Sequence, residues 1–249
     1  MYKGKQIAVV VPAYNEEIFI ASVIKGMPEF VDRIYVINDA STDRTEEIAA
    51  TLARSNNKVK VISHKRNRGV GGAITTGHSL VLKDKSDVAA IMAGDNQMAP
   101  EYLSGLLEPV VNGIADYAKG DRMSCPEHNE TMPRFRRFGT RLLTILTRIS
   151  SGYWHINDPQ NGYTVISATA LSKIPLHRLN SGYAFENDML VHLNLIGAKV
   201  MDVSHPAVYN GQCSCICYPR FVVKTSWILL KRWIWRLWKK YVAARYSKQ

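Results

Sequence analysis

The sequence lacks any long uninterrupted run of apolar residues. No segment reaches the ~18 consecutive apolar residues that a membrane-spanning helix needs. Met1 to Gln6 is polar, and the short apolar run that follows stops at Pro12, so the chain does not open with the pattern of a signal peptide. We therefore expect a cytoplasmic protein whose contact with a membrane is peripheral, on the inner face.

Cysteine is also scarce, with four residues at Cys125, Cys213, Cys215 and Cys217. The last three alternate along the chain and would share one face of a strand. Zinc sites usually combine two C-x2-C pairs, which this chain lacks. Free thiols in a reducing cytoplasm are therefore favoured over a metal or redox site.

Acidic residues are absent from the last part of the chain. Residues 220–249 contain nine Lys and Arg and no Asp or Glu, whereas residues 1–219 contain 23 basic and 21 acidic side chains. Of the formal net charge of +11, only +2 thus belongs to the body of the chain. Such a basic block indicates an anionic partner, either a membrane surface or a nucleic acid.

Residues 227–242 of this basic segment have the pattern of an amphipathic helix. At about 100° per residue, one side carries Arg232, Arg236, Lys239 and Lys240, and the opposite side is rich in tryptophan. This pattern is typical of a helix that lies on anionic lipid; the alternative is a terminal helix packed on the body. Because the body is nearly neutral and the apolar side is large, we expect membrane contact and no nucleic-acid binding.

The first 110 residues, in contrast, alternate regularly between strands and helices. Short β-branched runs, each followed by a helix-like segment, indicate parallel βαβ units and an α/β fold. Ser41 or Thr42 is the expected N-cap of the second helix. The expected strands are Ile7–Val11, Arg33–Asn38, Lys58–Ser63 and Val88–Met92, and the expected helices are Asn15–Gly26, Ser41–Arg54, Ala73–Leu82 and one from Pro100.

The second half of the chain continues the same domain with a less regular rhythm. The sequence contains no internal repeat and no low-complexity linker. We therefore predict one domain over residues 1–219, with halves 1–117 and 118–219, followed by a tail over 220–249. The expected elements of the second half are the helices Arg134–Ile149 and Asn187–Ile196 and the strands Tyr163–Ser167 and Lys199–Val203.

Three of the first four strand ends carry a carboxylate: Glu16, Asp39 and Asp95. Ligands of such sheets bind beyond the carboxyl ends of the strands. Tyr14 and Glu16 could hold a nucleoside by stacking and ribose hydrogen bonds, and Asp39 could accept from a base or ribose; the alternatives are a plain strand exit and an Asx-turn. Asp95 could hold a divalent cation, because Mg²⁺ and Mn²⁺ prefer oxygen ligands; the alternative is a β-turn.

A glycine-rich turn at residues 67–73 precedes the third helix. It has neither the G-x-G-x-x-G spacing of a dinucleotide site nor the Gly-Lys-Ser/Thr of a P-loop. Its glycines still allow the backbone to come close to a ligand, and the helix N-terminus that follows favours anions.

Together and in this order, the four segments resemble the family-2 glycosyltransferases of the GT-A fold, most closely the polyprenyl-phosphate (dolichol-phosphate) mannose and glucose synthases. The resemblance implies a Rossmann-like, mainly parallel central sheet with helices on both faces, here followed by the C-terminal amphipathic helix. Residues 12–16 match the family's Pro-x-Tyr-Asn-Glu opening, 38–45 its Asp-Asp-Gly-Ser-x-Asp-x-Thr segment, 67–73 its Asn-x-Gly-x-Gly-x-Ala loop and 93–97 its Asp-Ala-Asp-x-Gln metal site.

The resemblance also implies the residues of the donor site. Two positions depart from the family's pattern, because Asn38 and Ala93 each replace an Asp. Ala93 removes one carboxylate of the metal site, but Asp95, Gln97, the donor diphosphate and water could still complete an octahedron around Mg²⁺ or Mn²⁺. The implied nucleotide-sugar ligands are Pro12, Tyr14, Glu16, Asp39, Arg68, Gly94, Asp95 and Gln97, and the implied metal ligands are Asp95 and Gln97.

The acceptor side is expected in the second half. Residues 158–163 and 182–188 look like later segments of the family, which makes Asp158 and Asp188, together with Asp95, the predicted catalytic residues. A helix cap or a salt bridge is the alternative role for Asp158 and Asp188. The family binds its lipid phosphate with arginines in this region; the alternative for them is a solvated helix face. The candidates are Arg122, Arg134, Arg137 and Arg141.

The leading interpretation is an inverting, metal-assisted transferase that moves a hexose from a UDP- or GDP-linked sugar to a polyprenyl (dolichyl or undecaprenyl) phosphate at the cytoplasmic membrane face. A transferase with a soluble or glycan acceptor is the first alternative. A non-catalytic sugar-nucleotide-binding protein is the second, and it is motivated by Ala93.

Overall fold

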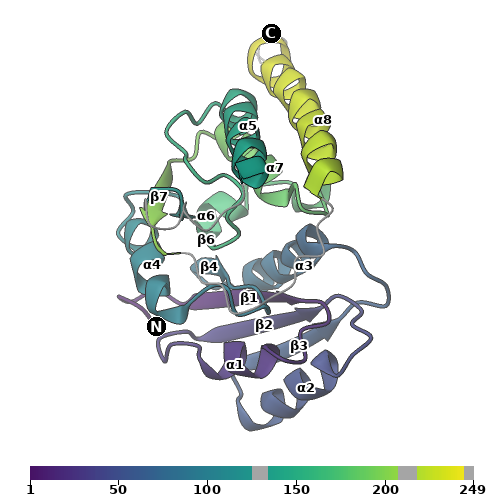
Figure 1. Ribbon diagram of the computed structural model, residues 1–249. Helices are drawn as coiled ribbons and strands as arrows, with labels where there is room; N and C mark the ends of the chain where they lie inside the picture. Colours follow the sequence, from purple (N-terminus) through teal and green to yellow (C-terminus); the bar gives the residue numbers. More distant parts are fainter. Residues whose placement is uncertain (125–133, 207–217, 244–249) are drawn as a thin grey trace.

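A seven-stranded sheet forms the centre of the protein, with the strand order β3-β2-β1-β4-β6-β5-β7 (Figure 1). The computed structural model describes residues 1–124, 134–206 and 218–243. β6 runs antiparallel to its neighbours β4 and β5, and the other pairs are parallel, so the predicted mainly parallel sheet is confirmed. The strands are β1 (Ile7–Ala13), β2 (Arg33–Asn38), β3 (Val59–Ser63), β4 (Val88–Ile91), β5 (Tyr117–Asp121), β6 (Thr164–Ser167) and β7 (Val200–Ser204).

Helices cover both faces of the sheet, because alternate residues of a strand point to opposite faces. In β1, Val9 and Val11 join one apolar core, whereas Ala8 and Val10 join the other. The first core is covered by α1 (Ile20–Lys25), α2 (Thr45–Ser55) and α4 (Leu103–Val111), and the second by α3 (Val70–Lys83), α6 (Ala168–Leu171) and α7 (Phe185–Leu195). Two short 3-10 helices, η1 (Pro100–Tyr102) and η3 (Leu176–Arg178), lie in the connections.

β5 is a strand that the sequence pattern did not reveal. Its residues Tyr-Ala-Lys-Gly-Asp are all buried, although lysine, glycine and aspartate are depleted in strands. The ammonium group of Lys119 donates to the carbonyl oxygen of Asn161, and the Asp121 carboxylate accepts from the N–H groups of Met123 and Ser124. Polar groups that find partners inside the protein can be buried, and they hide the apolar pattern from which a strand is predicted.

The prediction that Ser41 or Thr42 caps the second helix is wrong, because α2 begins only at Thr45. The Ser41 hydroxyl accepts instead from the backbone N–H of Asn15 at 3.0 Å. The Thr45 hydroxyl likewise accepts from the N–H of Glu16 at 2.7 Å. The segment after β2 therefore holds the turn after β1, and α1 starts later than the sequence indicated.

Two long helices project side by side from the second half of the chain (Figure 1). They are α5 (Arg134–Ser151) and α8 (Tyr218–Leu237), and a π-helical turn, η4 (Trp238–Ala243), continues α8. The predicted C-terminal helix is confirmed, and it begins at Tyr218 instead of Trp227. Within the described residues, no helix has the length and apolar character required to cross a membrane.

The arginine side of α8 faces the protein, contrary to the interpretation of the sequence. Arg232 forms a salt bridge with Asp188 at 2.7 Å, and Arg236 donates to the side-chain oxygen of Asn194 at 3.1 Å. Leu229 stands among these charges in the helical projection and is only 1% exposed, because it lies on the packed side. The outward side carries the large apolar residues Trp227, Leu230, Trp233, Ile234, Trp238 and Tyr241, all of which are exposed.

Two helical glycines allow a matched test of the packing between helices and sheet. A Cβ at Gly77 of α3 would overlap the side chain of Val10 on β1, whereas a Cβ at Gly105 of α4 would meet its nearest atom only at 4.0 Å. We expect Gly77→Ala to lower the free energy of unfolding by about 1–3 kcal/mol. Gly105→Ala should raise it by about 0.4–1 kcal/mol, because alanine restricts the unfolded chain. Urea unfolding checks both signs, and a stabilised Gly77→Ala protein would contradict the tight contact with β1.

Candidate active site

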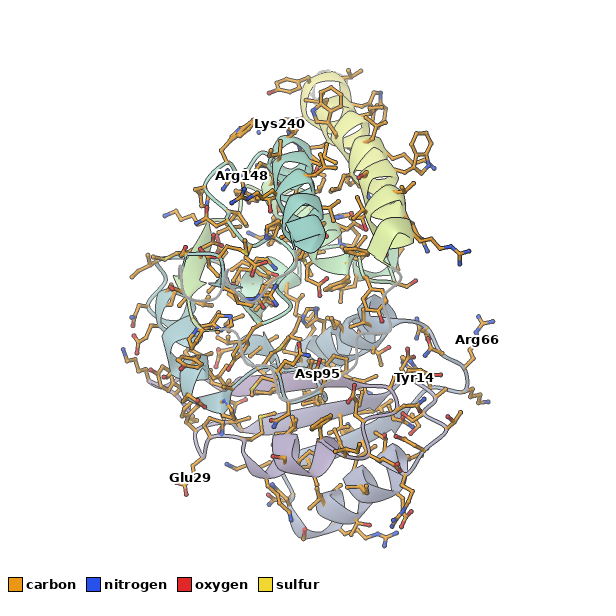
Figure 2. All side chains as sticks on the ribbon, in the orientation of Figure 1. Tyr14, Glu29, Arg66, Asp95, Arg148 and Lys240 are labelled. Carbon is orange, nitrogen blue, oxygen red and sulfur yellow. The ribbon has the colours of Figure 1, made fainter. Side chains whose placement is uncertain are left out.

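The carboxyl ends of β1, β2 and β4 bring three of the predicted segments together. The N–H of Gly94 donates to the carbonyl oxygen of Pro12 at 3.0 Å, and the N–H of Asp39 donates to that of Ala13 at 2.9 Å. Asp95 lies between the sheet and the helices of the second half (Figure 2). This is the edge of the sheet at which α/β folds bind their ligands.

Glu16 and Asp95 lie close enough to repel each other. Gly94 has little room for a side chain, because a Cβ there would lie 3.1 Å from Cβ of Ala13 and 3.4 Å from Cγ of Glu16. Burial, together with the negative charges of Asp95 and Asp43, raises the pKa of Glu16 to about 7. Burial also raises the pKa of Asp95. A cation bound beside these two carboxylates would favour their ionised forms.

The residues around Asp95 fit a divalent cation in combination with a phosphate ligand. In the part of the chain that the structure describes, no three His, Cys, Asp or Glu side chains are grouped so that they could hold a metal by themselves. The backbone N–H of Gln97 donates to Oδ1 of Asp95 at 3.0 Å and orients the carboxylate. Mg²⁺ usually takes one or two carboxylates and completes its octahedron with phosphate oxygens and water. The alanine at position 93 is compatible with such a site.

Asp39 is 3% exposed and is held by contacts from two other segments. Its Oδ1 lies 2.6 Å from Nδ1 of His64, which follows β3, and accepts from the N–H of Arg68 at 2.9 Å. The carboxylate therefore links the end of β2 to the glycine turn. Tyr14 lies at the rim of this region (Figure 2), and the residue is 47% exposed, which leaves it accessible to a stacking partner.

The glycine turn is in contact with a segment of the second half, Asn180–Gly182. The N–H of Gly72 donates to the carbonyl oxygen of Ser181 at 3.1 Å. A Cβ at Gly69 would lie 2.5 Å from the same oxygen, and the φ of Gly69 is +81°, where side chains are strained. The glycines thus permit a close approach of two backbone segments, and their contact with a ligand stays a prediction.

In the second half, the structure joins two predicted residues in one salt bridge. Nε and Nη2 of Arg122 lie 2.7 and 3.2 Å from the two carboxylate oxygens of Asp158, which is fully buried. Burial alone would raise the pKa of Asp158, but the guanidinium of Arg122 and the nearby Lys119 hold it below its usual value. The salt-bridge role that the sequence left open for Asp158 is therefore present, and its catalytic role stays a prediction.

Asp188 is also fully buried and paired with an arginine. Nη2 of Arg232 donates to Oδ2 of Asp188 at 2.8 Å, and the N–H of Asn180 donates to the same oxygen at 2.9 Å. Among the predicted phosphate-binding arginines of α5, Arg141 is exposed. The side chains of Arg134 and Arg137, and all four cysteines, lie outside the described residues.

Two buried charges beside this region, Lys119 and Glu186, were not predicted from the sequence; they are 0% and 7% exposed. Burial lowers the pKa of Lys119 to about 8, although the charge of Glu186 opposes the change. Burial raises the pKa of Glu186. A Cβ at Gly162 would lie 3.5 Å from Oε1 of Glu186 and 3.1 Å from Cε of Met98, so Gly162 lies between Glu186 and the residue that follows the loop 93–97. The position of Glu186 in the acidic segment 182–188 was the one sequence feature that could have pointed to it.

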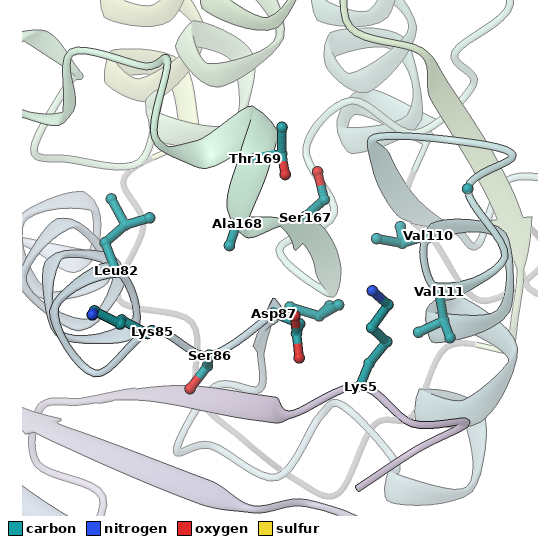
Figure 3. A pocket seen from close by; sticks show the side chains of 12 residues that line it. Lys5, Leu82, Lys85, Ser86, Asp87, Val110, Val111, Ser167, Ala168 and Thr169 are labelled. Carbon is teal, nitrogen blue, oxygen red and sulfur yellow. The ribbon is translucent and has the colours of Figure 1, made fainter.

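A separate hollow lies at the other end of the sheet (Figure 3). It is lined by residues before β4 and after β6, and its charged groups include Lys5, Lys85 and Asp87. Asp95 follows β4 at the opposite end of that strand. The hollow is therefore distant from the carboxylates that form the candidate site.

Comparison with known proteins agrees with this geometry. The model of the family described as Glycosyl transferase family 2 matches residues 8–175. The UDP-N-acetylglucosamine–dolichyl-phosphate N-acetylglucosaminyltransferase of Methanococcus voltae is 32% identical over 180 residues, which cover 67% of this chain and 71% of that protein. The undecaprenyl-phosphate mannosyltransferase of Micrococcus luteus is 29% identical over 203 residues, covering 80% and 82%.

Solved structures support the fold. Glucosyl-3-phosphoglycerate synthase from Mycobacterium tuberculosis, in complex with Mn²⁺, uridine diphosphate and phosphoglyceric acid, aligns with a TM-score of 0.69 at 19% identity, covering 94% of this chain and 78% of that chain. A likeness at this identity concerns the fold alone, and it confirms the predicted GT-A fold. Because the family match spans more than half of the chain and includes the strand ends that carry the carboxylates, the protein belongs to glycosyl transferase family 2 and is a glycosyltransferase.

Proposed function

We propose that this glycosyltransferase moves a hexose from a UDP- or GDP-linked sugar to a polyprenyl phosphate. The observation that carries the proposal is the meeting of Glu16, Asp39 and Asp95 at one edge of the sheet. The acceptor class is supported by the relatives named above, which are a dolichyl-phosphate and an undecaprenyl-phosphate transferase. In this proposal, residues 1–117 bind the donor, residues 118–219 bind the acceptor, and residues 220–249 associate with the membrane.

The nucleoside is the part of the donor that we assign to the ends of β1 and β2. The exposed ring of Tyr14 is suited to stacking on the base. The carboxylates of Glu16 and Asp39 are suited to accept hydrogen bonds from ribose or base. Pro12 lies near the carboxyl end of β1, and its carbonyl oxygen accepts from the N–H of Gly94, which keeps the loop 93–97 beside the nucleoside site.

The diphosphate is assigned to the space between the glycine turn and the Asp95 loop. The side chain of Arg68 is exposed, and the N-terminus of α3 follows it, so both favour an anion. Gly94 allows the Asp95 loop to approach closely, and Asp95 and Gln97 would hold Mg²⁺ or Mn²⁺. The bound metal would neutralise the negative charge that develops on the leaving nucleotide.

The acceptor phosphate is already ionised, so the transfer depends on position and charge more than on a strong base. Its oxygen attacks the anomeric carbon opposite the nucleotide, the bond from that carbon to the diphosphate oxygen breaks with its electron pair, and the configuration inverts. Arg122 is oriented by Asp158, and its side chain remains 32% exposed, which suits it to meet the phosphate. Arg134, Arg137 and Arg141 of α5 are the further candidates.

The membrane is assigned to the outward side of α8 and η4, within residues 227–242. Because Arg232 and Arg236 are used inside the protein, the large apolar residues of the helix point away from it. Apolar and aromatic side chains of this kind enter the boundary between headgroups and acyl chains. The exposed Lys239 and Lys240 are suited to anionic headgroups of the cytoplasmic face.

Two exposed isoleucines test this assignment with the same substitution. Ile234 on α8 is 57% exposed, and Ile114 in the turn after α4 is 60% exposed. Ile234→Gln should weaken binding to anionic vesicles by about five- to thirtyfold, because burial of an isoleucine contributes roughly 1–2 kcal/mol. Ile114→Gln should leave vesicle binding unchanged. Co-sedimentation with vesicles measures both, and an equal response of the two variants would contradict the assignment to α8.

A donor panel tests the proposed reaction directly. The full chain is incubated with polyprenyl phosphate in vesicles, Mn²⁺ or Mg²⁺, and radiolabelled UDP- or GDP-sugars. Label in the organic phase supports the proposal and identifies the sugar. Label transferred only to water-soluble products would favour a soluble acceptor. Donor binding without transfer to any acceptor would favour a sugar-nucleotide-binding protein.

A further inference from the structure

The segment Asn180–Gly182 lies between α8 and the donor half of the protein. On the side of α8, the N–H of Asn180 donates to Oδ2 of Asp188 at 2.9 Å. The N–H of Gly182 donates to the side-chain oxygen of Asn180 at 2.9 Å, so the segment is also held internally. The position of this backbone therefore depends on a carboxylate that is completely buried.

Arg232 of α8 provides the positive charge opposite this carboxylate. Its Nε lies 2.7 Å from Oδ1 of Asp188, and its Nη2 donates to Oδ2 at 2.8 Å. Nη2 also donates to the carbonyl oxygen of Arg178 at 2.7 Å, just before the segment. The contact of Nη2 is a hydrogen bond and that of Nε is an ion pair; a planar guanidinium can make both at once, which a lysine ammonium does not. Arg232 thus fixes the Asn180–Gly182 segment in two ways, through Asp188 and through the backbone just before the segment.

On the opposite side, the Asn180–Gly182 segment is in close backbone contact with the glycine turn. The carbonyl oxygen of Ser181 accepts from the N–H of Gly72 at 3.1 Å. A Cβ at Gly71 would overlap the carbonyl oxygen of Asn180, and a Cβ at Gly69 would lie 2.5 Å from that of Ser181. Because close-packed groups transmit displacements, a shift of the segment moves the turn.

The glycine turn in turn contacts the proposed nucleoside site. The N–H of Arg68, immediately before Gly69, donates to Oδ1 of Asp39 at 2.9 Å. A continuous series of contacts therefore leads from Arg232 through Asp188, the Asn180–Gly182 segment and the glycine turn to Asp39.

We propose that Arg232 is a positioning residue for the nucleotide-sugar site, which it does not itself touch. Through this series of contacts, the helix that carries the outward apolar side also determines the geometry of the turn that receives the donor. The inference rests on the proposed function for the identity of the donor. In this proposal α8 has a second role besides membrane association, because the packing of the helix on the body sets the affinity for the nucleotide.

The test compares Arg232→Ala with Arg236→Ala in the full chain. Both changes remove an arginine that ties α8 to the body, but Arg236 bonds Asn194 and the carbonyl oxygen of Ile149 and not Asp188. Titration calorimetry with UDP and with GDP, in the presence of Mn²⁺, should show an affinity about tenfold lower for Arg232→Ala. Hydrogen exchange at residues 69–76 should be faster in the same variant. Arg236→Ala should keep the affinity and the exchange rate of the wild type, even where its Tm falls equally.

A second variant covers the case in which Arg232→Ala does not fold. Arg232→Lys keeps the charge and loses the fork, so it should show an intermediate affinity. An unchanged affinity and unchanged exchange at residues 69–76 in the folded Arg232 variants would overturn the positioning role, as would equal effects in Arg236→Ala. Failure of the wild type to bind either nucleotide would instead overturn the proposed donor class.

Discussion

Asp95→Asn is expected to reduce the initial rate of sugar transfer by at least about 100-fold. Asp95 is the one carboxylate in the loop 93–97, because position 93 is alanine. A neutral amide is a weaker ligand for Mg²⁺ or Mn²⁺ than a carboxylate, so less charge on the leaving nucleotide would be neutralised. The rate at saturating donor, measured over a range of Mn²⁺ concentrations, should fall and should need more metal to reach its maximum.

The same change should not weaken the fold. Burial raises the pKa of Asp95, which means that its ionised form is disfavoured where no cation is bound. An asparagine of the same shape removes that charge, so the metal-free Tm of Asp95→Asn should equal or exceed that of the wild type. Glu101→Gln, which neutralises an exposed carboxylate a few residues further on, is the matched control and should keep full activity. Transfer by Asp95→Asn at more than half the wild-type rate would contradict the role of Asp95 as a metal ligand.

Arg122→Ala is expected to lower the free energy of unfolding at pH 7 by about 3–5 kcal/mol. The substitution leaves the carboxylate of Asp158, which is fully buried, without the guanidinium that bonds both of its oxygens. Arg141→Ala, on an exposed part of α5, is the control and should change stability by less than about 0.5 kcal/mol. Urea unfolding followed by tryptophan fluorescence measures both. A loss below about 1 kcal/mol in Arg122→Ala would show that water or another group replaces the arginine.

The effect of Arg122→Ala should also depend on pH. In the wild type, the pKa of Asp158 in the folded state is below its usual value, so the pair stabilises the protein above the unfolded pKa of about 3.9. That stability is lost as the pH falls through the folded pKa. In the variant, burial without the guanidinium raises the pKa of Asp158, and protonation then relieves the penalty. The stability difference should therefore be largest above about pH 6 and should shrink toward pH 4; a difference that is constant with pH would contradict the role of the Asp158 charge.

The donor half was the part most accessible to prediction. β1, β2 and β4 are largely buried parallel strands, and such strands appear in the sequence as nearly continuous apolar runs. Their carboxyl ends meet at one edge of the sheet, so the sequence alone predicts that Glu16, Asp39 and Asp95 lie together. Hydrogen bonds of the loops beside them, at Pro12 and Ala13, confirm that adjacency.

Partners that come from distant parts of the chain could not be predicted in the same way. Asp158 and Asp188 were recognised as important, but their arginines lie 36 and 44 residues away in the sequence. The buried Lys119 made β5 look unlike a strand, although a carbonyl oxygen of the 158–163 segment satisfies it. Pairing over such separations depends on how helices dock, and no local propensity contains that information.

For the C-terminal helix, the local sequence predicts the helix itself, and tertiary packing decides how it is oriented. Periodicity in residues 227–242 was sufficient to establish a two-sided helix, since a spacing of 3.6 residues sorts the arginines from the tryptophans. The periodicity did not reveal which side of the helix faces the body, because arginines can be buried where a buried carboxylate pairs with them. Asp188 on α7 provides that carboxylate, and its bond to Arg232 turns Trp227, Trp233 and Trp238 outward. The two-sided pattern of the helix is therefore determined by the local sequence. Its orientation is determined by the tertiary structure, because leaving the buried charge of Asp188 unpaired would destabilise the fold.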